Sequence, residues 1–147
     1  MCLDKFLALN QGKKIVFTNG CFDILHPGHV TYLNEAKSLG DILVIGINSD
    51  ASVKRLKGET RPVNSESDRK YVLENLKAVD FVEIFTDDTP LNLILKVHPH
   101  ILVKGGDWKV EQIIGGKEVV QWGGEVKSLS LVPQKSTSNI IAKILKL

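Results

Sequence analysis

The chain has 147 residues and a formal net charge of +2; 43% of its residues are hydrophobic and 24% are charged. These proportions are typical of a globular protein, and the length fits one domain, which we expect to span residues 1–147. The small net charge gives no reason to expect a nucleic acid partner. No apolar run approaches the ~18 residues of a membrane span, and the first residues are too polar for a signal peptide. We therefore expect a cytoplasmic protein with no membrane partner.

Short apolar segments, many of them β-branched, alternate along the chain with segments of helical periodicity. Strands are predicted at residues 14–18, 42–47, 81–85, 101–103 and 126–132. Helices are predicted near 28–39, from Ser65, from Pro90, near 110–122 and from the STSN stretch at 136–139. This alternation predicts an α/β fold, with a Rossmann-like, doubly wound, mainly parallel five-stranded sheet flanked by helices.

The predicted helices have recognisable starts and apolar faces. Ser65 and Asp68 have the spacing of a capping box, and Thr89 followed by Pro90 indicates an N-cap and a first helical residue. In three helices, apolar residues at helical spacing are expected to face the core. They are Val72, Leu73, Leu76 and Val79; Leu91, Ile94 and Leu95; and Ile140, Ile141, Ile144 and Leu145.

Ligands of a doubly wound sheet bind beyond the carboxyl ends of its strands, at the switch point. Four polar strand-to-helix connections would gather there, at 19–29, 48–61, 104–108 and 134–139. The turns at 38–41, 96–100 and 122–125 would lie at the opposite end and serve as connectors.

His26 and His29 are three residues apart in the first of these connections, with Gly28 between them at the start of a helix. Zinc would need further ligands, and the other two histidines, His98 and His100, are predicted at the opposite end of the sheet. A purely structural role, in a turn and a helix cap, is a second alternative. Free helical N–H groups beside two imidazole donors favour a third, the binding of phosphate during a displacement reaction.

Other motifs for phosphate or nucleophilic chemistry are missing. The sequence has no GxxxxGK[ST] loop, no GxGxxG after the first strand and no GxSxG elbow. Cys21 follows an apolar strand and is interpreted as a small packed residue rather than as a nucleophile. A histidine-based phosphate site supported by lysines is the interpretation that remains.

Two motifs carry a resemblance to a known superfamily. GCFDILHPGH, at 20–29, resembles the HxGH signature of the nucleotidyltransferases related to the class I aminoacyl-tRNA synthetases, in the form found in their cytidylyltransferase-like branch. KSTSNII, at 135–141, resembles a second element of that superfamily, I-S-[ST]-T, at the start of the last helix. Nearly the whole chain is similar to the adenylyltransferases of ADP-heptose synthesis, including the segments NSDASVKRLKGETRPVN and ILVKGGDW.

The resemblance implies an enzyme that transfers an adenylyl group from ATP to D-glycero-β-D-manno-heptose 1-phosphate for lipopolysaccharide core precursors. A triphosphate is normally the Mg²⁺ complex, and this ion prefers phosphate oxygens to a cage of protein ligands, so we expect Mg²⁺ carried by ATP, no dedicated protein metal site and no organic cofactor. A separate heptose kinase would act in the same pathway, since we expect the stand-alone form without a kinase domain, and a homodimer is compatible with the family. The alternatives are a cytidylyltransferase, a flavin mononucleotide adenylyltransferase and a non-catalytic nucleotide-binding module on the same fold.

The resemblance also implies roles for individual residues. His26, His29 and Lys57 would be catalytic, the histidines at the α-phosphorus and the lysine on the β- and γ-phosphates, with Lys54 as the alternative lysine. The other residues expected to bind the nucleotide are Thr18, Asn19, Gly20, Phe22, Asp23 and Gly28 after the first strand; Lys104, Gly105, Gly106, Asp107 and Trp108 after the fourth; and Ser136, Thr137 and Ser138 at the last helix.

Two positions depart from the superfamily pattern. Ile141 stands where the second element often carries an arginine, and Lys143 is the nearest cation; Ser138 stands where threonine is commoner. Arg61 and Arg69 are interpreted as structural. Trp108 either lines the base or packs its loop onto the domain.

Overall fold

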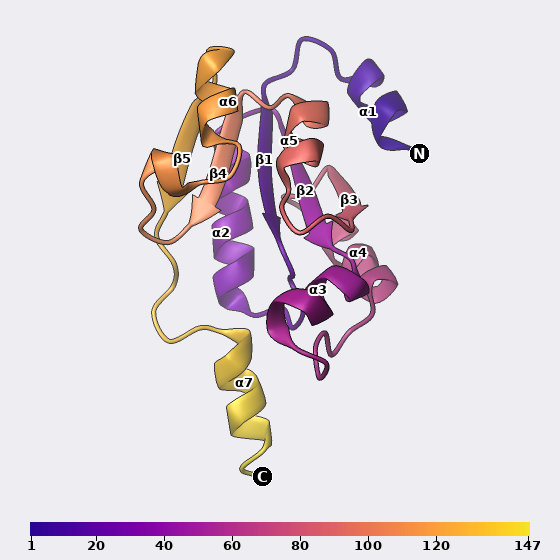
Figure 1. Ribbon diagram of the computed structural model, residues 1–147, viewed down its shortest axis with the longest axis vertical. Helices are drawn as coiled ribbons and strands as arrows, with labels where there is room; N and C mark the ends of the chain where they lie inside the picture. The colour runs from indigo at the N-terminus through magenta and orange to yellow at the C-terminus, as the bar shows by residue number, and fades with distance from the viewer.

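The computed structural model describes residues 1–147 and is built around one five-stranded sheet (Figure 1). Its strands are β1 (Ile15–Gly20), β2 (Ile42–Asn48), β3 (Phe81–Phe85), β4 (Ile101–Gly105) and β5 (Glu125–Leu129). They lie in the order β3-β2-β1-β4-β5, and every neighbouring pair is parallel. The predicted Rossmann-like sheet of five strands is confirmed, and all of its strands are parallel.

The strands are apolar because both faces of the sheet are covered. All seven residues of β2 are buried. Side chains alternate along each strand, so Val16 and Leu43 enter the core on one face, whereas Phe17 and Val44 enter the core on the other. The pairing of Val16 with Leu43 and of Phe17 with Val44 keeps these two sets in register.

Seven α-helices and one short 3-10 helix accompany the sheet. They are α1 (Leu3–Leu9), α2 (Pro27–Ser38), α3 (Asp50–Lys57), α4 (Glu66–Glu74), α5 (Leu91–Val97), η1 (Val110–Gln112), α6 (Gly116–Gln121) and α7 (Thr137–Ile144). Helices α2 and α4 cover one face through Leu33 and Leu73, and α1, α5 and α6 cover the other through Leu3, Ile94 and Val119. None of the helices has the length and apolar character that crossing a bilayer would require.

The strand order places the switch point of the sheet beside β1. From β1 the chain builds β2 and β3 on one side, and then crosses to build β4 and β5 on the other side. The carboxyl ends of all five strands therefore face one edge, where connections from the two halves diverge. A crevice for a ligand is expected at this edge.

Helices α4 and α5 start near the predicted positions but bury fewer of the predicted residues. Ser65 caps α4, since its Oγ accepts the N–H of Asp68 at 3.2 Å, as predicted. Val72 is 47% exposed, so its assignment to the core is wrong. Thr89 does not cap α5, and Leu95 is 45% exposed. Ile94 is buried as predicted, but the helix starts after Pro90, and Leu93 and Val97, rather than Leu91 and Leu95, complete its buried face.

Two other segments also differ from the sequence-based prediction. The connection over 48–61 contains a helix that was not predicted: residues 50–57 form α3, with Ser49 Oγ accepting the N–H of Ser52. This helix is rich in basic residues and buries only Ser52 and Val53, so its sequence shows no clear apolar periodicity. The helix predicted near 110–122 is interrupted between η1 and α6, where Gly115 has a φ of +83° that a continuous helix does not allow.

Helix α7 begins as predicted at Ser136, whose Oγ accepts the N–H of Asn139 at 3.0 Å. The expected burial of its apolar stripe is wrong. No residue of α7 is buried, and Ile144 is 55% exposed and Leu145, which ends the helix, 81% exposed. The physical reason is its direction: α7 projects from the carboxyl edge of the sheet, away from both cores (Figure 1).

Candidate active site

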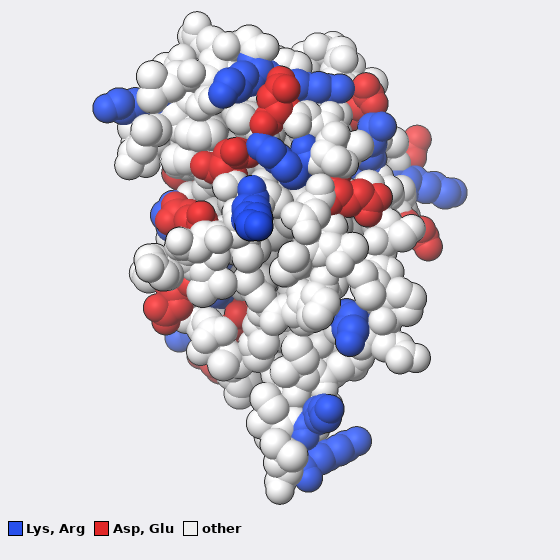
Figure 2. All heavy atoms as spheres, turned by 180° about the vertical axis from the view of Figure 1, so that it is seen from behind, with Lys and Arg blue, Asp and Glu red and all other residues white.

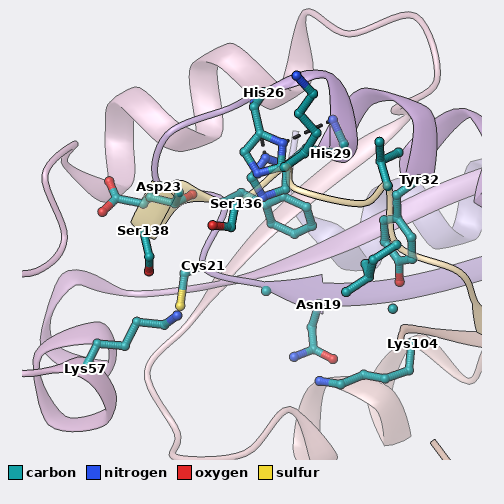
Figure 3. Close-up of a pocket in the computed structure, with 18 of the residues that line it drawn as sticks. Asn19, Cys21, Asp23, His26, His29, Tyr32, Lys57, Lys104, Ser136 and Ser138 are labelled. Atoms are coloured by element: carbon teal, nitrogen blue, oxygen red, sulfur yellow. Dashed lines mark hydrogen bonds between the residues drawn. The ribbon is translucent and has the colours of Figure 1, made fainter. Parts of the chain in front are cut away.

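A cavity of about 410 Å³ opens at the carboxyl edge of the sheet, where the switch point lies (Figure 3). The loop between β1 and α2 forms its centre, Lys57 and Arg61 come from the β2 side, and Lys104 and Gly105 come from the end of β4. The segment from Leu131 to Ser138, before and at the start of α7, completes the wall. All four polar connections singled out in the sequence thus meet in one cavity.

Thirteen of the predicted site residues line this cavity. They are Asn19, Gly20, Phe22, Asp23, His26, Gly28, His29, Lys57, Lys104, Gly105, Ser136, Thr137 and Ser138. Five predicted residues do not line it: Thr18, Lys54, Gly106, Asp107 and Trp108. Six lining residues were not predicted for the site: Cys21, Tyr32, Arg61, Leu131, Val132 and Lys135.

His26 and His29 are held by the first turn of α2. His26 is the N-cap, and its Nδ1 accepts the N–H of Gly28 at 3.1 Å. His29 reaches back, and its Nδ1 accepts the N–H of His26 at 3.3 Å. The ring centroids are 3.9 Å apart. Because each Nδ1 accepts a hydrogen bond, the proton of each neutral ring lies on Nε2, which remains free to donate.

Both imidazoles are neutral in this setting. Burial, with a smaller contribution from His26, lowers the pKa of His29 to about 4. Burial and the nearby Lys135 ammonium lower the pKa of His26 below its usual range. At neutral pH the pair therefore offers two N–H donors without a positive charge, and any cation in the site must come from other side chains.

The HPGH sequence explains this local structure. Pro27 occupies the first helical position, where its missing N–H is not needed. A Cβ on Gly28 would lie 2.7 Å from Cε1 and 2.8 Å from Nδ1 of His26. Only glycine therefore leaves room for the His26 ring against the helix start.

Asp23 lines the cavity and binds the segment at 61–64. Its carboxylate accepts hydrogen bonds from Arg61 Nε at 3.0 Å and from the N–H groups of Val63 and Asn64, each at 2.8 Å. Burial raises the pKa of this carboxyl, but the hydrogen bonds from Asn64, Val63 and Arg61 outweigh it and hold the pKa below its usual value. These bonds tie the 61–64 segment to the histidine loop.

Arg69 is structural, as predicted, and connects three segments around the cavity. Its side chain is fully buried, and its guanidinium donates to Cys21 O at 2.8 Å, Asn64 O at 3.0 Å and Asp50 Oδ1 at 2.8 Å. Because Asp50 begins α3, this arginine also fixes the helix that carries Lys57.

Two lysines face the cavity from opposite halves of the sheet. Lys57 ends α3 on the β2 side, and Lys104 belongs to β4. Figure 3 shows them on opposite sides, with Cys21 and Asn19 between them. Burial lowers the pKa of the Lys104 ammonium, which also lies 5.9 Å from the centre of the Trp108 ring. Of the two candidate lysines, Lys57 and Lys54, only Lys57 lines the cavity.

Thr18 and Trp108 have structural contacts outside the cavity. The Thr18 hydroxyl is buried and lies 2.7 Å from the hydroxyl of Tyr32, which itself lines the cavity. Trp108 Nε1 donates to Gly105 O at 2.9 Å, so the indole closes its own loop. Trp108 is 47% exposed and does not line the cavity.

The start of α7 is joined to the histidine loop. Thr137 Oγ1 donates to Ile24 O at 3.2 Å. Ser136 Oγ accepts the Asn139 N–H as the helix cap, and its own proton remains free to donate. Figure 3 shows Ser136 beside the histidine pair and Ser138 near Asp23. An anion in the cavity would therefore meet hydroxyl, imidazole and ammonium donors.

The other two histidines lie at the opposite edge of the sheet, as predicted. His98 stacks on Trp122 with 3.9 Å between ring centroids. His100 Nδ1 accepts the N–H of Ile15 at 3.0 Å. Both side chains are used in packing and pairing there.

The cytidylyltransferase-like family model matches residues 17–143, which include the whole cavity. The chain belongs to this family. The predicted family and enzyme class, a nucleotidyltransferase, are confirmed. The Bifunctional protein HldE of Pelobacter propionicus is 55% identical over 92% of this chain, and that of Campylobacter concisus is 56% identical over 97%. The present chain spans only 28% of the length of the Pelobacter relative and 29% of the length of the Campylobacter relative.

Solved structures agree with the family and the fold. A lipopolysaccharide core biosynthesis protein from Thermoplasma volcanium is 31% identical, with a TM-score of 0.68 over 84% of this chain and 100% of that chain. Pantothenate synthetase from Thermus thermophilus is 15% identical, with a TM-score of 0.64 over 93% of this chain and 64% of that chain. The second likeness concerns the fold alone.

Proposed function

We propose that this chain transfers an adenylyl group from ATP to D-glycero-β-D-manno-heptose 1-phosphate and releases pyrophosphate. The observation that carries the proposal is the pair of neutral histidines, with both Nε2–H groups free, in a cavity flanked by Lys57 and Lys104. Such a set binds and neutralises phosphate oxygens but contains no free carboxylate for acid–base chemistry. It suits a displacement at phosphorus, in which positioning and charge stabilisation do most of the catalysis.

In the proposed reaction, an oxygen of the sugar phosphate attacks the α-phosphorus of ATP, and the bond from the α-phosphorus to the pyrophosphate oxygen breaks. His26 and His29 donate to the α-phosphoryl oxygens, where negative charge develops. Lys57 binds the β- and γ-phosphates, which leave together. In-line attack requires the entering phosphate on the opposite flank, where Lys104 lies. Ser136, Thr137 and Ser138 would add donors from the start of α7.

Mg²⁺ would reach this site with the triphosphate, whose charge it neutralises. Asp23 is the one carboxylate in the cavity wall, and both of its oxygens already accept hydrogen bonds. Mg²⁺ prefers several waters and phosphate oxygens to a cage of protein ligands. The cavity therefore fits an ion held by the substrate, with the lysines and histidines binding the remaining phosphate oxygens.

The choice of heptose 1-phosphate rests on similarity. The HldE relatives are more than half identical over almost the whole chain, and the Thermoplasma protein is described by its role in lipopolysaccharide core biosynthesis. The segments SVKRLKGETRPVN and VKGGDW carry the same resemblance in the sequence. We further propose that residues 1–147 act as one cytoplasmic domain and that a separate heptose kinase acts in the same pathway.

Pyrophosphate release tests the proposal. ATP and CTP are each combined with heptose 1-phosphate, glycerol 3-phosphate and flavin mononucleotide in the presence of Mg²⁺. Release is expected with ATP and heptose 1-phosphate. Release with another pair would overturn the substrate assignment but keep the class of reaction, and nucleotide binding without release from any pair would favour a binding module.

A further inference from the structure

Lys135 is a cation of the cavity wall that the family motif does not assign. It precedes Ser136 and lines the cavity, whereas Lys143, the nearest cation expected from the sequence, does not. None of the ion pairs in the structure includes Lys135. From Val126 onward the sequence contains lysines but no aspartate or glutamate. The lower tip in Figure 2, formed by α7, accordingly shows basic and no acidic side chains.

A tight turn presents this lysine. Lys135 donates its N–H to Val132 O at 3.4 Å, and Pro133 and Gln134 lie between them. Gln134 has a φ of +61°, a conformation that is unfavourable for a residue other than glycine or asparagine. The side chain of Asn139 donates to Gln134 O at 3.4 Å and holds the turn from α7. Unfavourable backbone conformations of this kind persist where the surrounding structure requires them, often at functional sites.

The stem of Lys135 lies against the catalytic helix start. A Cβ built on Gly28 would come within 3.1 Å of Lys135 Cβ and within 2.8 Å of the His26 ring. Lys135 and His26 therefore share the small space that Gly28 leaves open. The hydrogen bond from Thr137 to Ile24 fastens the same segment to the histidine loop. The Cβ of Lys135 is thus fixed beside His26, and the flexible rest of the side chain can bring the ammonium group into the cavity.

The site lacks a positive charge beside the histidine pair, and Lys135 is placed to supply one. The histidines are uncharged donors, and Lys57 and Lys104 stand on the two flanks. Negative charge in phosphoryl transfer develops on the oxygens of the α-phosphoryl group, and a positive charge close to them stabilises the transition state.

We propose that Lys135 is a catalytic residue whose ammonium binds the α-phosphoryl oxygens of the nucleotide beside His26, in the role for which Lys143 was the candidate. This inference rests on the proposed nucleotidyl transfer. It adds a residue to that site and does not depend on which sugar phosphate accepts the nucleotide.

The test compares Lys135→Gln, Lys135→Arg and Lys143→Gln with the unchanged chain. Lys143→Gln is the matched control, because it removes the same charge from the same helix region outside the cavity. We expect Lys135→Gln to lower kcat/KM for Mg·ATP by about 100-fold, the size of effect seen when one transition-state donor is removed. The Kd for Mg·ATP, measured by calorimetry, should rise by about tenfold. Lys135→Arg should recover much of both values, and Lys143→Gln should stay within about twofold.

A merely structural role for Lys135 would lower the thermal midpoint and leave the Kd of the folded protein unchanged. An unchanged Kd and kcat/KM in Lys135→Gln, or equal losses in Lys143→Gln, would overturn the inference. The failure of the proposed function looks different. If the unchanged chain releases no pyrophosphate with any acceptor, the Kd comparison between the two lysine variants still decides whether Lys135 contacts the triphosphate.

Discussion

Asp23 and Arg61 form an ion pair of 3.0 Å in which the carboxylate is almost completely buried. The same carboxylate accepts the N–H groups of Val63 and Asn64, so one side chain from the β1–α2 loop holds the whole 61–64 segment. Asp23 therefore has a structural role in the cavity wall, because protein donors already occupy both of its carboxylate oxygens. The predictions below begin with this pair.

Asp23→Asn should destabilise the protein by about 3–5 kcal/mol, because an amide cannot accept all three hydrogen bonds and leaves a partly buried guanidinium without its partner. Urea denaturation at neutral pH measures this loss. Asp88→Asn is the control, since Asp88 pairs with Arg55 at the exposed surface. This substitution should lower the free energy of unfolding by less than about 1 kcal/mol. Equal losses in the two variants would contradict the role of Asp23.

His29→Ala should reduce kcat by about 100-fold or more while the protein stays folded, because it removes one of the two neutral N–H donors. Pyrophosphate release gives the rate, and circular dichroism gives the thermal midpoint. His98→Ala provides the comparison, because His98 stacks on Trp122 at the opposite edge of the sheet. It should lower the midpoint and leave the rate of the folded protein unchanged. A His29→Ala variant with near-normal kcat would refute the assignment.

The low pKa of His29 predicts a pH-dependent stability. Its pKa is about 4 in the folded protein, whereas an unfolded histidine titrates near 6.5. Between these values the unfolded chain binds the proton and the folded chain does not, so stability should fall as the pH drops from about 6.5 to about 4 and then level off. Urea denaturation across this range measures it, with His29→Gln as the reference. The same slope in both proteins would show that His29 is not its source.

Gly28→Ala should affect activity more than stability. The added Cβ would collide with the His26 ring and press on Lys135, but alanine favours the helix by about 1 kcal/mol relative to glycine. We expect kcat to fall at least tenfold while the midpoint of urea denaturation changes little. A crystal structure of the variant should show His26 displaced from its hydrogen bond with the Gly28 N–H. A rate within twofold of the unchanged chain would show that the ring can move without cost.

The central sheet and the histidine loop were predictable because their signals are local. The apolar run that forms β2 is continuous, and a strand buried on both faces requires such a run. His26 and His29 follow β1 directly, so the parallel topology alone brings them to the carboxyl edge. The same argument placed Lys104 and the hydroxyls at the start of α7 in the cavity.

Other features depend on contacts between segments far apart in the sequence. Tyr32 and Arg61 line the cavity, but only the fold reveals that Tyr32 meets Thr18 and that Arg61 meets Asp23. Helix α1 has too few residues for a clear period, and it is held by packing against the sheet through Leu3. The apolar stripe of α7 has the spacing of a core helix, yet spacing cannot tell in which direction a helix leaves the sheet.

That direction has a consequence for local unfolding. Since α7 buries none of its residues and joins the histidine loop through the hydrogen bond from Thr137, it should open at a much lower free energy than the sheet. Its amide hydrogens should then exchange rapidly in the free protein and slowly once Mg·ATP bridges the loop and the helix start. Part of the binding free energy would then offset the ordering of α7, so the affinity for nucleotide would depend on how readily residues 137–144 form a helix.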